Sequence, residues 1–581
     1  YPHNHQRPLW ASTGVKDPSY DKTMYVTQLV AADTVNTMPE ATLNAVIAQG
    51  KCDGDSISAN FKNARSQIAK LAMSGIDFEN IFNFLESDGV KKFETSWNDL
   101  IATVSNKLKI SQLIIDDMTK SSDSTISITG RLLSKVDSNI QTELLEISKR
   151  LAKLDDTIWG KDSEAKTRLG WVNLPKTSRD LLPTLDALSA WARSNSITNF
   201  VLCGMGGSSL GPEVIAKTYG KKLVVLDSTD PRQISAAIPN DLERLSKTLF
   251  IISSKSGTTI ETLSQFEYIK SVLTQFNLSF EKHFVIVTDS GSALAKMAED
   301  LNLKLVLADA TVGGRFSALS AFGLVPSALI GVDVATLLDD AESALKMLVQ
   351  VDSPAISLAA LLFTQTQLFF TVSDDTSDLV GFSDWLEQLV AESTGKNQTG
   401  RLPVVVRRIS SQINGSNESS GIGIVTISKN LTKANEQYDL IITAPLGAAF
   451  FIWEWATALL GYLLKVDPFN QPNVAEAKEQ TNIALNSTRS THPKSYAGEN
   501  FTIYSEQQLN NISEIRKMDF QYLAVMAYIH RNFDSELFEL QENLARFTKR
   551  PVTVGYGPRF LHSTGQFHKG GPQAAVFIQI V

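Results

Sequence analysis

Short apolar runs alternate with longer helical patterns through the middle of the chain. One set occupies residues 199–203, 223–226, 249–253, 284–288 and 303–307, and a second occupies Leu379–Phe382, Val404–Val406, Ile422–Ile427 and Leu440–Thr443. Strands that are buried on both faces of a parallel sheet have this apolar character, and crossover helices separate them. The pattern predicts an α/β fold with two doubly wound subdomains that face one cleft.

The amino-terminal part has a different pattern. Residues 7–11 read as a short strand, and a polar loop and several helices with apolar residues at helical spacing follow. Residues 113–153 read as amphipathic helix without a glycine-rich loop. The predicted parts are a barrel edge with helices at 1–109, a helical connector at 110–175, a first subdomain at 176–345 and a second at 346–581.

One stretch, Leu440–Leu464, is apolar enough to be weighed as a membrane span. Pro445, Gly447 and Glu454 interrupt it. A buried strand at 439–444 followed by a core helix explains the stretch with less strain. We therefore expect no membrane association.

Composition narrows the classes of function. The chain has 581 residues, of which 43% are hydrophobic and 20% charged, as in soluble proteins of several domains. Its net charge of -8 argues against broad nucleic-acid binding. Cys52 and Cys203 cannot form a disulfide framework, and no closely spaced Cys/His set indicates zinc. We expect a cytosolic protein with no metal and no cofactor.

The first residue, Tyr1, has no signal core after it, which we read as amino-terminal truncation.

Two loops carry the first chemical signal. The strand at 199–203 runs into Gly204–Pro212, where Ser208 sits before a helix. Alone, this loop is as compatible with a tight turn as with anion binding. The strand at 249–253 runs into the hydroxyl-rich loop Ser254–Thr259, and the two loops belong to one sheet. Together they predict a cradle for a monophosphate, since the order of a nucleoside-triphosphate loop is absent.

Five segments in sequence order carry a resemblance to a known family. They are Gly204–Pro212, Ser254–Thr262, Val312–Ser317, Glu392–Lys396 and His562–Lys569. Over about residues 170–581 the chain resembles the glucose-6-phosphate isomerases. The resemblance implies paired sugar-isomerase (SIS) subdomains, a cytoplasmic homodimer, and interconversion of glucose 6-phosphate and fructose 6-phosphate through a cis-enediol(ate), in glycolysis and gluconeogenesis.

The resemblance also implies roles for individual residues. Glu392 would be the base that moves a proton between C2 and C1, Arg315 would stabilise the enediolate, and Lys569 would assist ring opening. Phosphate contacts would come from Ser208, Ser254, Ser256, Thr258 and Thr259, and further substrate contacts from Gly207, His562 and Gln566. The chain departs from the better-known branch at Pro445–Phe451, where no histidine stands. Ring opening would then rest on Lys569 with His562, Gln566 or His568, or on another group.

A second resemblance lies at the amino end. Arg7–Gly14 and Asp33–Pro39 resemble the last strand–loop segments of transaldolase, a TIM-type barrel of the pentose phosphate pathway, over about residues 1–109. Arg168–Trp171 and Asp467–Pro472 resemble a branch in which transaldolase and isomerase are fused. The Schiff-base lysine of transaldolase belongs to earlier strands, so we expect no aldol transfer here. Ser12 and Lys16 are candidate remnants of its phosphate site.

Each of the three charged residues also has an interpretation without a catalytic role. Arg315 fits a salt bridge between subdomains, and Glu392 and Lys569 fit solvated positions. The chain as a whole fits an isomerase that also accepts mannose 6-phosphate, or a non-catalytic sugar-phosphate sensor. A sensor needs the hydroxyl-rich loop but has no need of all three charged residues together. Their joint presence favours the enzyme.

Overall fold

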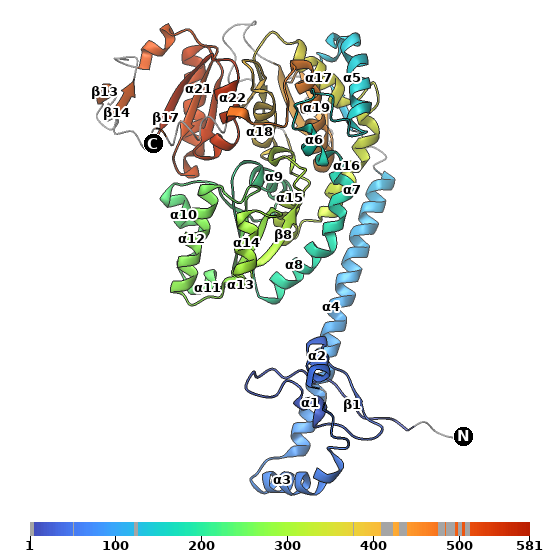
Figure 1. Cartoon of the computed structure of the whole chain (residues 1–581). Coiled ribbons are helices and arrows are strands. Elements are labelled where there is room, and N and C mark those ends of the chain that lie inside the picture. The colour runs from blue at the N-terminus through green and yellow to red at the C-terminus, as the bar shows by residue number, and fades with distance from the viewer. Residues whose placement is uncertain are drawn as a thin grey trace. The chain divides into compact units, whose positions relative to one another are not determined.

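The structure is a computed structural model that describes residues 5–49, 51–120, 126–375, 377–407, 422–428, 438–473, 483, 494–497, 502–505 and 512–581. The chain divides into two units, Tyr1–Ser121 and Ser122–Val581 (Figure 1).

The first unit contains a small parallel strand pair and helices. Strand β1 (Leu9–Trp10) pairs with β2 (Val35–Asn36). The helices are α1 (Met24–Thr27), α2 (Glu40–Gln49), α3 (Phe61–Met73) and α4 (Phe78–Lys120). Among the described side chains of this unit, only threonines are buried, and Met73 is 90% exposed. The predicted strand at 7–11 and the helices after it are confirmed.

The second unit contains a five-stranded parallel sheet with strand order β5-β4-β6-β7-β8. Its strands are β4 (Asn199–Gly204), β5 (Val224–Leu226), β6 (Thr248–Ser253), β7 (Phe284–Asp289) and β8 (Lys304–Ala308). The helices around it are α8 (Leu182–Ser194), α9 (Leu210–Thr218), α10 (Pro231–Ala237), α11 (Leu242–Leu245), α12 (Ile260–Gln275), α13 (Phe280–His283), α14 (Ala293–Asp300) and α15 (Ala321–Leu329). The first predicted strand set is confirmed within one residue at every boundary.

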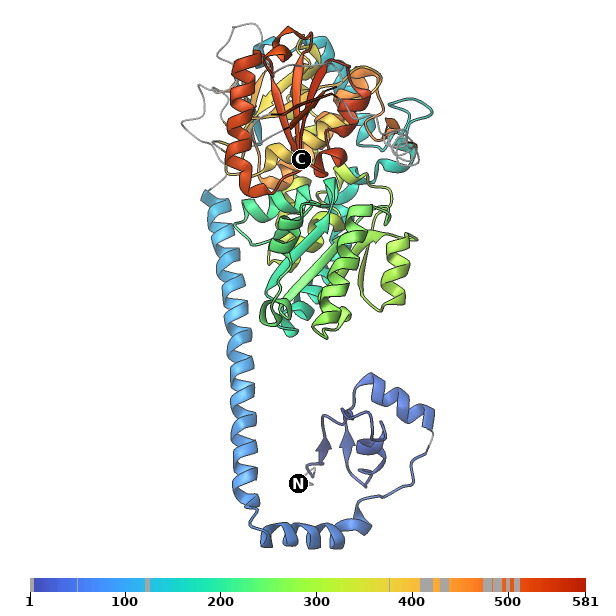
Figure 2. The same ribbon diagram turned by 90° about the vertical axis from the view of Figure 1, so that its left-hand side faces the viewer.

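Alternation along β6 shows why this sheet is buried on both faces. Leu249 and Ile251 belong to one hydrophobic core, and Phe250 and Ile252 belong to another. Successive side chains of a strand point to opposite faces, so a continuous apolar run serves two cores. The helices on both faces cover these cores, as Figure 2 shows for the green part of the ribbon.

A second five-stranded sheet has the order β10-β9-β11-β12-β3. Its strands are β3 (Ser127–Thr129), β9 (Phe369–Val372), β10 (Leu402–Val405), β11 (Gly423–Ile427) and β12 (Leu440–Thr443), and β3 alone runs antiparallel to its neighbour. Helices α5 (Ser138–Leu151), α16 (Val334–Leu348), α17 (Pro354–Thr364), α18 (Phe382–Thr394) and α19 (Leu446–Leu464) accompany it. The all-helical prediction for residues 113–153 is wrong at β3.

The predicted strand Leu379–Phe382 is also wrong. These residues form the entry to α18, because the Asp374 carboxylate accepts hydrogen bonds from the backbone N–H of Gly381 at 2.9 Å and of Ser383 at 3.1 Å. Gly381 has a φ of 82°, a conformation that suits glycine and ends an extended run. The strand lies earlier, at β9.

Helix α19 explains the apolar stretch that was weighed as a membrane span. It is long enough to cross a membrane, but 94% of its apolar window is buried inside the protein. It packs against α16 and α17 (Figure 1). The prediction of a buried strand followed by a core helix is confirmed.

The carboxyl-terminal part adds a three-stranded parallel sheet that the sequence pattern did not predict. Its order is β16-β15-β17, from β15 (Tyr522–Ala527), β16 (Val552–Tyr556) and β17 (Ala575–Ile580). Helix α21 (Asp534–Thr548) lies along it (Figure 2), and the short helix α22 (Gly565–Gly570) precedes β17. Strand β13 (Lys494–Ala497) pairs antiparallel with β14 (Thr502–Ser505).

Candidate active site

The two predicted phosphate loops leave neighbouring strands. Gly204 at the end of β4 pairs with Ser253 at the end of β6. The first loop forms a short 3-10 helix at Gly206–Ser208, and a β-carbon on Gly207 would overlap the carbonyl oxygen of Gly314. The backbone of the Gly-Gly-Arg segment therefore lies directly against this loop, and only glycine permits that approach.

The second loop gathers hydroxyl groups before α12. Ser254 Oγ lies 3.0 Å from Thr259 Oγ1, and Ser256 Oγ lies 3.0 Å from Thr258 Oγ1. Thr259 is the N-cap residue of α12, yet its side chain does not cap the helix. The first N–H groups of the helix thus keep their capacity to bind an anion, and the helix dipole favours one there. The arrangement suits a phosphate group.

Arg315 lies at the centre of the site and is only 2% exposed. Its Nε donates to Ser393 Oγ at 2.8 Å, and Nη1 donates to Glu392 Oε1 at 3.2 Å. Its Nη2 donates to the carbonyl oxygens of Pro468 and Asn470. Burial lowers the pKa of Arg315 from its ordinary value, and the Glu392 carboxylate opposes that shift. A guanidinium keeps its charge under such conditions.

Glu392 projects from α18 and is 6% exposed. Oε1 accepts hydrogen bonds from Arg315 and from the Gln471 side chain, and Oε2 accepts one from Gln388 Nε2 at 2.9 Å. Gln388 lies one helical turn earlier on α18 and also donates to the carbonyl oxygen of His562 at 2.7 Å. The carboxylate is thus fixed in one orientation.

Lys396 lies just beyond α18 and is 2% exposed. Its Nζ donates to the carbonyl oxygen of Asp467. Burial and then the charge of Arg315 lower the pKa of Lys396 well below its ordinary value. Lys396 and Arg315 therefore both bind carbonyl oxygens of one segment, residues 467–471.

The carboxyl-terminal site residues lie around α22. His562 precedes this helix and its Nε2 lies 3.3 Å from Glu261 Oε1. Gln566 is buried and donates to the carbonyl oxygen of Gly395 at 3.0 Å. Lys569 is exposed on the same short helix. Gln566 thereby fastens this helix to the end of α18, next to Glu392.

His568 is less suited to proton transfer. Its Nδ1 lies 2.9 Å from the hydroxyl of Tyr522. Burial and the neighbouring charge of Lys569 lower the pKa of His568 to about 4. The ring is therefore neutral at pH 7.

The structure thus brings Arg315 and Glu392 together directly and places the two loops side by side. The sequence analysis did not identify Gln388 and Gln471, whose side chains donate to Glu392. The helical spacing of Gln388 and Glu392 was a usable signal, since residues four apart share a helix face. For Gln471 the signal was the segment Asp467–Pro472, to which the sequence analysis gave no role in the site.

Among the described side chains, no group of three His, Cys, Asp or Glu is placed to hold a metal ion.

Comparison with known proteins divides the chain into the same two regions as the sequence motifs, an amino-terminal region and a following larger one. Residues 1–104 match the family Transaldolase/Fructose-6-phosphate aldolase, and residues 179–414 match the family Phosphoglucose isomerase. Transaldolase 2 of Streptomyces avermitilis is 50% identical over 106 residues, which is 18% of this chain and 28% of that protein. A transaldolase of Mycobacterium bovis is 52% identical over 96 residues, 16% of this chain and 26% of that protein. The chain spans little more than a quarter of the length of these relatives.

A solved structure supports the fold. A hypothetical protein from Thermus thermophilus aligns with a TM-score of 0.52 at 24% identity, over 62% of this chain and 100% of that chain. The fold is that of an α/β protein with parallel sheets, and the family match over residues 179–414 lies in its second unit. The chain joins a transaldolase segment at residues 1–104 to a phosphoglucose isomerase domain at residues 179–414. Both resemblances that the motifs indicated are confirmed.

Proposed function

We propose that this chain interconverts glucose 6-phosphate and fructose 6-phosphate through a cis-enediolate, as a cytosolic homodimer without metal or cofactor. The observation that carries the proposal is the buried pair of Glu392 and Arg315, whose carboxylate has three donors around it. A sensor would need a phosphate loop, but not a base held in one orientation beside a buried cation.

In this mechanism Glu392 removes the proton from C2 of the open-chain aldose and returns it to C1. Arg315 stabilises the negative charge that develops on the C1 and C2 oxygens, because a guanidinium stays charged in a buried site. Ser208, Ser254, Ser256, Thr258 and Thr259 hold the phosphate. Gly207 allows the first loop to lie close to the segment that carries Arg315.

We assign ring opening to Lys569, with His562 and Gln566 holding the sugar hydroxyls near it. Lys569 gives a proton to the ring oxygen as the bond between that oxygen and C1 breaks, and the C1 hydroxyl loses its proton to water as the carbonyl forms. The Pro445–Phe451 segment has no histidine that could protonate the ring oxygen instead. We do not assign this step to His568, because its lowered pKa leaves the ring neutral at pH 7 and its Nδ1 lies 2.9 Å from the Tyr522 hydroxyl. We assign no aldol transfer to residues 1–104, which correspond to 28% of transaldolase 2 of Streptomyces avermitilis.

The test is conversion of fructose 6-phosphate to glucose 6-phosphate by the purified chain and by Glu392→Gln, without added metal. We expect turnover by the parent and loss of at least about 1,000-fold in the variant, in the range seen when a general base is removed. Mannose 6-phosphate, tested beside it, reports whether the C2 epimer shares the enediol. A folded parent that binds a sugar phosphate without turnover would favour the sensor.

A further inference from the structure

One segment of the chain, residues 467–471, contacts both proposed catalytic side chains. The carbonyl oxygens of Pro468 and Asn470 accept hydrogen bonds from Arg315, and the side chain of Gln471 donates to Glu392. We call residues 467–471 the clamp loop. Its shape decides where the guanidinium and the carboxylate stand relative to each other.

Asp467 holds the clamp loop in that shape. Its Oδ1 accepts a hydrogen bond from the backbone N–H of Phe469 at 2.8 Å, and its Oδ2 accepts one from the backbone N–H of Glu164 at 2.7 Å. The first bond closes a turn within the loop. The second ties the loop to the residue that precedes helix α6 (Ala165–Arg168).

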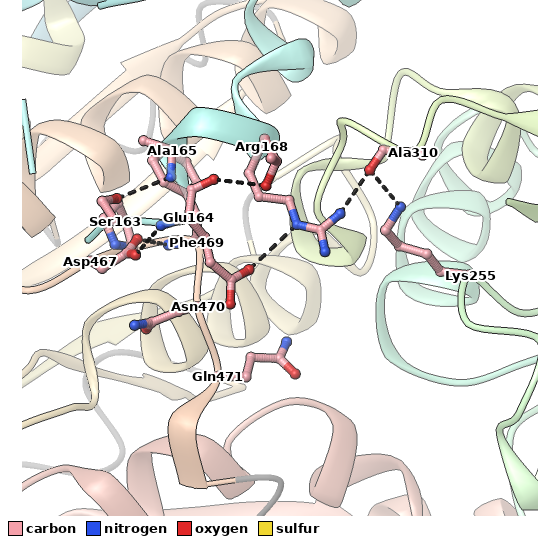
Figure 3. Close-up of polar contacts among 12 residues, drawn as sticks. Ser163, Glu164, Ala165, Arg168, Lys255, Ala310, Asp467, Phe469, Asn470 and Gln471 are labelled. Atoms are coloured by element: carbon pink, nitrogen blue, oxygen red, sulfur yellow. Dashed lines mark hydrogen bonds and ion pairs between the residues drawn. The ribbon is translucent and has the colours of Figure 1, made fainter. Parts of the chain in front are cut away.

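Helix α6 in turn is fastened to the first sheet. Arg168 Nη1 donates to the carbonyl oxygen of Ala310 at 2.7 Å, and Lys255 Nζ donates to the same oxygen at 3.3 Å (Figure 3). Lys255 belongs to the proposed phosphate loop and pairs with Asp289 at 2.5 Å. The backbone N–H of Gly170 also donates to Thr311, at 3.2 Å.

These contacts form a continuous connection from the phosphate loop to the base. We propose that Asp467 is a positioning residue for the isomerisation. Its carboxylate binds the residue before α6, and α6 connects to the phosphate loop, so that Asp467 fixes the distance between the clamp loop and the phosphate loop. This inference rests on the proposed function. A substrate whose phosphate is held at one end must present C1 and C2 to Glu392 at the other, so that this distance matters for the chemical step.

Packing of the clamp loop predicts that the fold survives loss of Asp467. The Phe469 ring lies 4.9 Å from the Trp159 ring and 5.4 Å from the Phe316 ring, centroid to centroid. These contacts keep the loop docked, while the backbone turn that Asp467 closes becomes looser. The effect is therefore expected on catalysis more than on stability.

The experiment compares the full chain with Asp467→Ala, Asp467→Asn and a matched control, Asp155→Ala. The Asp155 carboxylate likewise accepts a hydrogen bond from a backbone N–H two residues on, that of Thr157 at 3.0 Å, and it pairs with Arg150. For Asp467→Ala we expect kcat to fall about 10- to 100-fold, because a displaced catalytic group can cost about 100-fold. KM and the inhibition constant of inorganic phosphate should change by less than about threefold.

The remaining variants sharpen the result. Asp467→Asn keeps one acceptor oxygen and should lose less than Asp467→Ala, and Asp155→Ala should match the parent. The kcat of Arg168→Ala should fall only a few-fold, because Gly170 still binds Thr311.

An active parent with an unchanged kcat in Asp467→Ala overturns this inference alone. So does a fall in phosphate affinity that parallels the fall in kcat, since it indicates general loosening. An inactive parent overturns the proposed function, and this inference with it.

Discussion

Arg315 and Glu392 form a buried ion pair, with Nη1 3.2 Å from Oε1 and both side chains less than 10% exposed. Each partner is also held by neutral groups, Arg315 by Ser393 and two carbonyl oxygens and Glu392 by two glutamine side chains. Burial of a single charge is costly, so neither side chain is expected to tolerate loss of the other without a cost to the fold.

Arg315→Lys should lower kcat by about 100-fold or more. Lysine keeps the charge but cannot reproduce the planar set of donors that reaches Ser393, Glu392 and the clamp loop at once. The matched control is Arg401→Lys, in which a guanidinium bound to the carbonyl oxygens of Leu362 and Phe363 is replaced. Steady-state kinetics should show the loss in the first variant and a kcat near that of the parent in the second. Equal kcat values in the two variants would contradict the role of Arg315.

Gln388→Leu should lower kcat by about 10- to 100-fold, the equivalent of about 1.5–3 kcal/mol for a lost hydrogen bond to a charged group. The reason is that Gln388 orients Oε2 of Glu392 and also holds the carbonyl oxygen of His562. Gln265→Leu is the control, because Gln265 is equally buried but donates to Ser228 in the first subdomain. A kcat within twofold of the parent in Gln388→Leu would show that the base needs no such support.

Gly207→Ala should destabilise the fold by about 1–3 kcal/mol, the usual range for overpacking. Its new methyl group would meet the backbone of Gly314, which has no flexible end to move aside. Gly314→Ala offers the comparison, since a β-carbon there meets nothing within 4 Å. Thermal or urea unfolding should separate the two variants, and a Gly207→Ala protein as stable as the Gly314→Ala protein would disprove the close approach.

Stability should fall on acidification between about pH 6.5 and 4 in part through His568. Its pKa is lowered to about 4 in the folded chain, and an unfolded histidine titrates near 6.5. Between these values the unfolded chain binds the additional proton, so that lowering the pH favours unfolding. His568→Gln should therefore lose less stability than the parent between pH 7 and pH 4.5. An identical loss in both proteins would mean that this ring does not contribute.

The sequence predicted the first sheet well because its strands are simple in pattern. Leu249–Ser253 is a continuous apolar run that serves two cores, and such a run has few other interpretations. The second sheet was harder. Phe369–Val372 is short and follows polar residues, whereas Leu379–Phe382 has a strand-like composition but becomes a helix entry once Asp374 accepts its N–H groups.

The candidate site residues were predicted from motifs, whereas the contacts among them depend on the tertiary structure. Arg315 and Glu392 were identified from their own segments, but 77 residues separate them, and their pairing emerges only from the packing of α18. The clamp loop lies a further 75 to 79 residues along the chain from Glu392. The amino-acid composition of the clamp loop does not indicate that its carbonyl groups contact the guanidinium of Arg315.

The most direct test of the account is isomerisation of fructose 6-phosphate in D₂O by the parent and by Glu392→Gln, with the product analysed for deuterium. In the reverse direction Glu392 takes the proton from C1, and this proton exchanges with the solvent while the carboxyl group holds it. The account therefore predicts deuterium at C2 in part of the glucose 6-phosphate that the parent forms, and neither product nor label with the variant. Undiminished turnover by Glu392→Gln would contradict the assignment of Glu392 as the base.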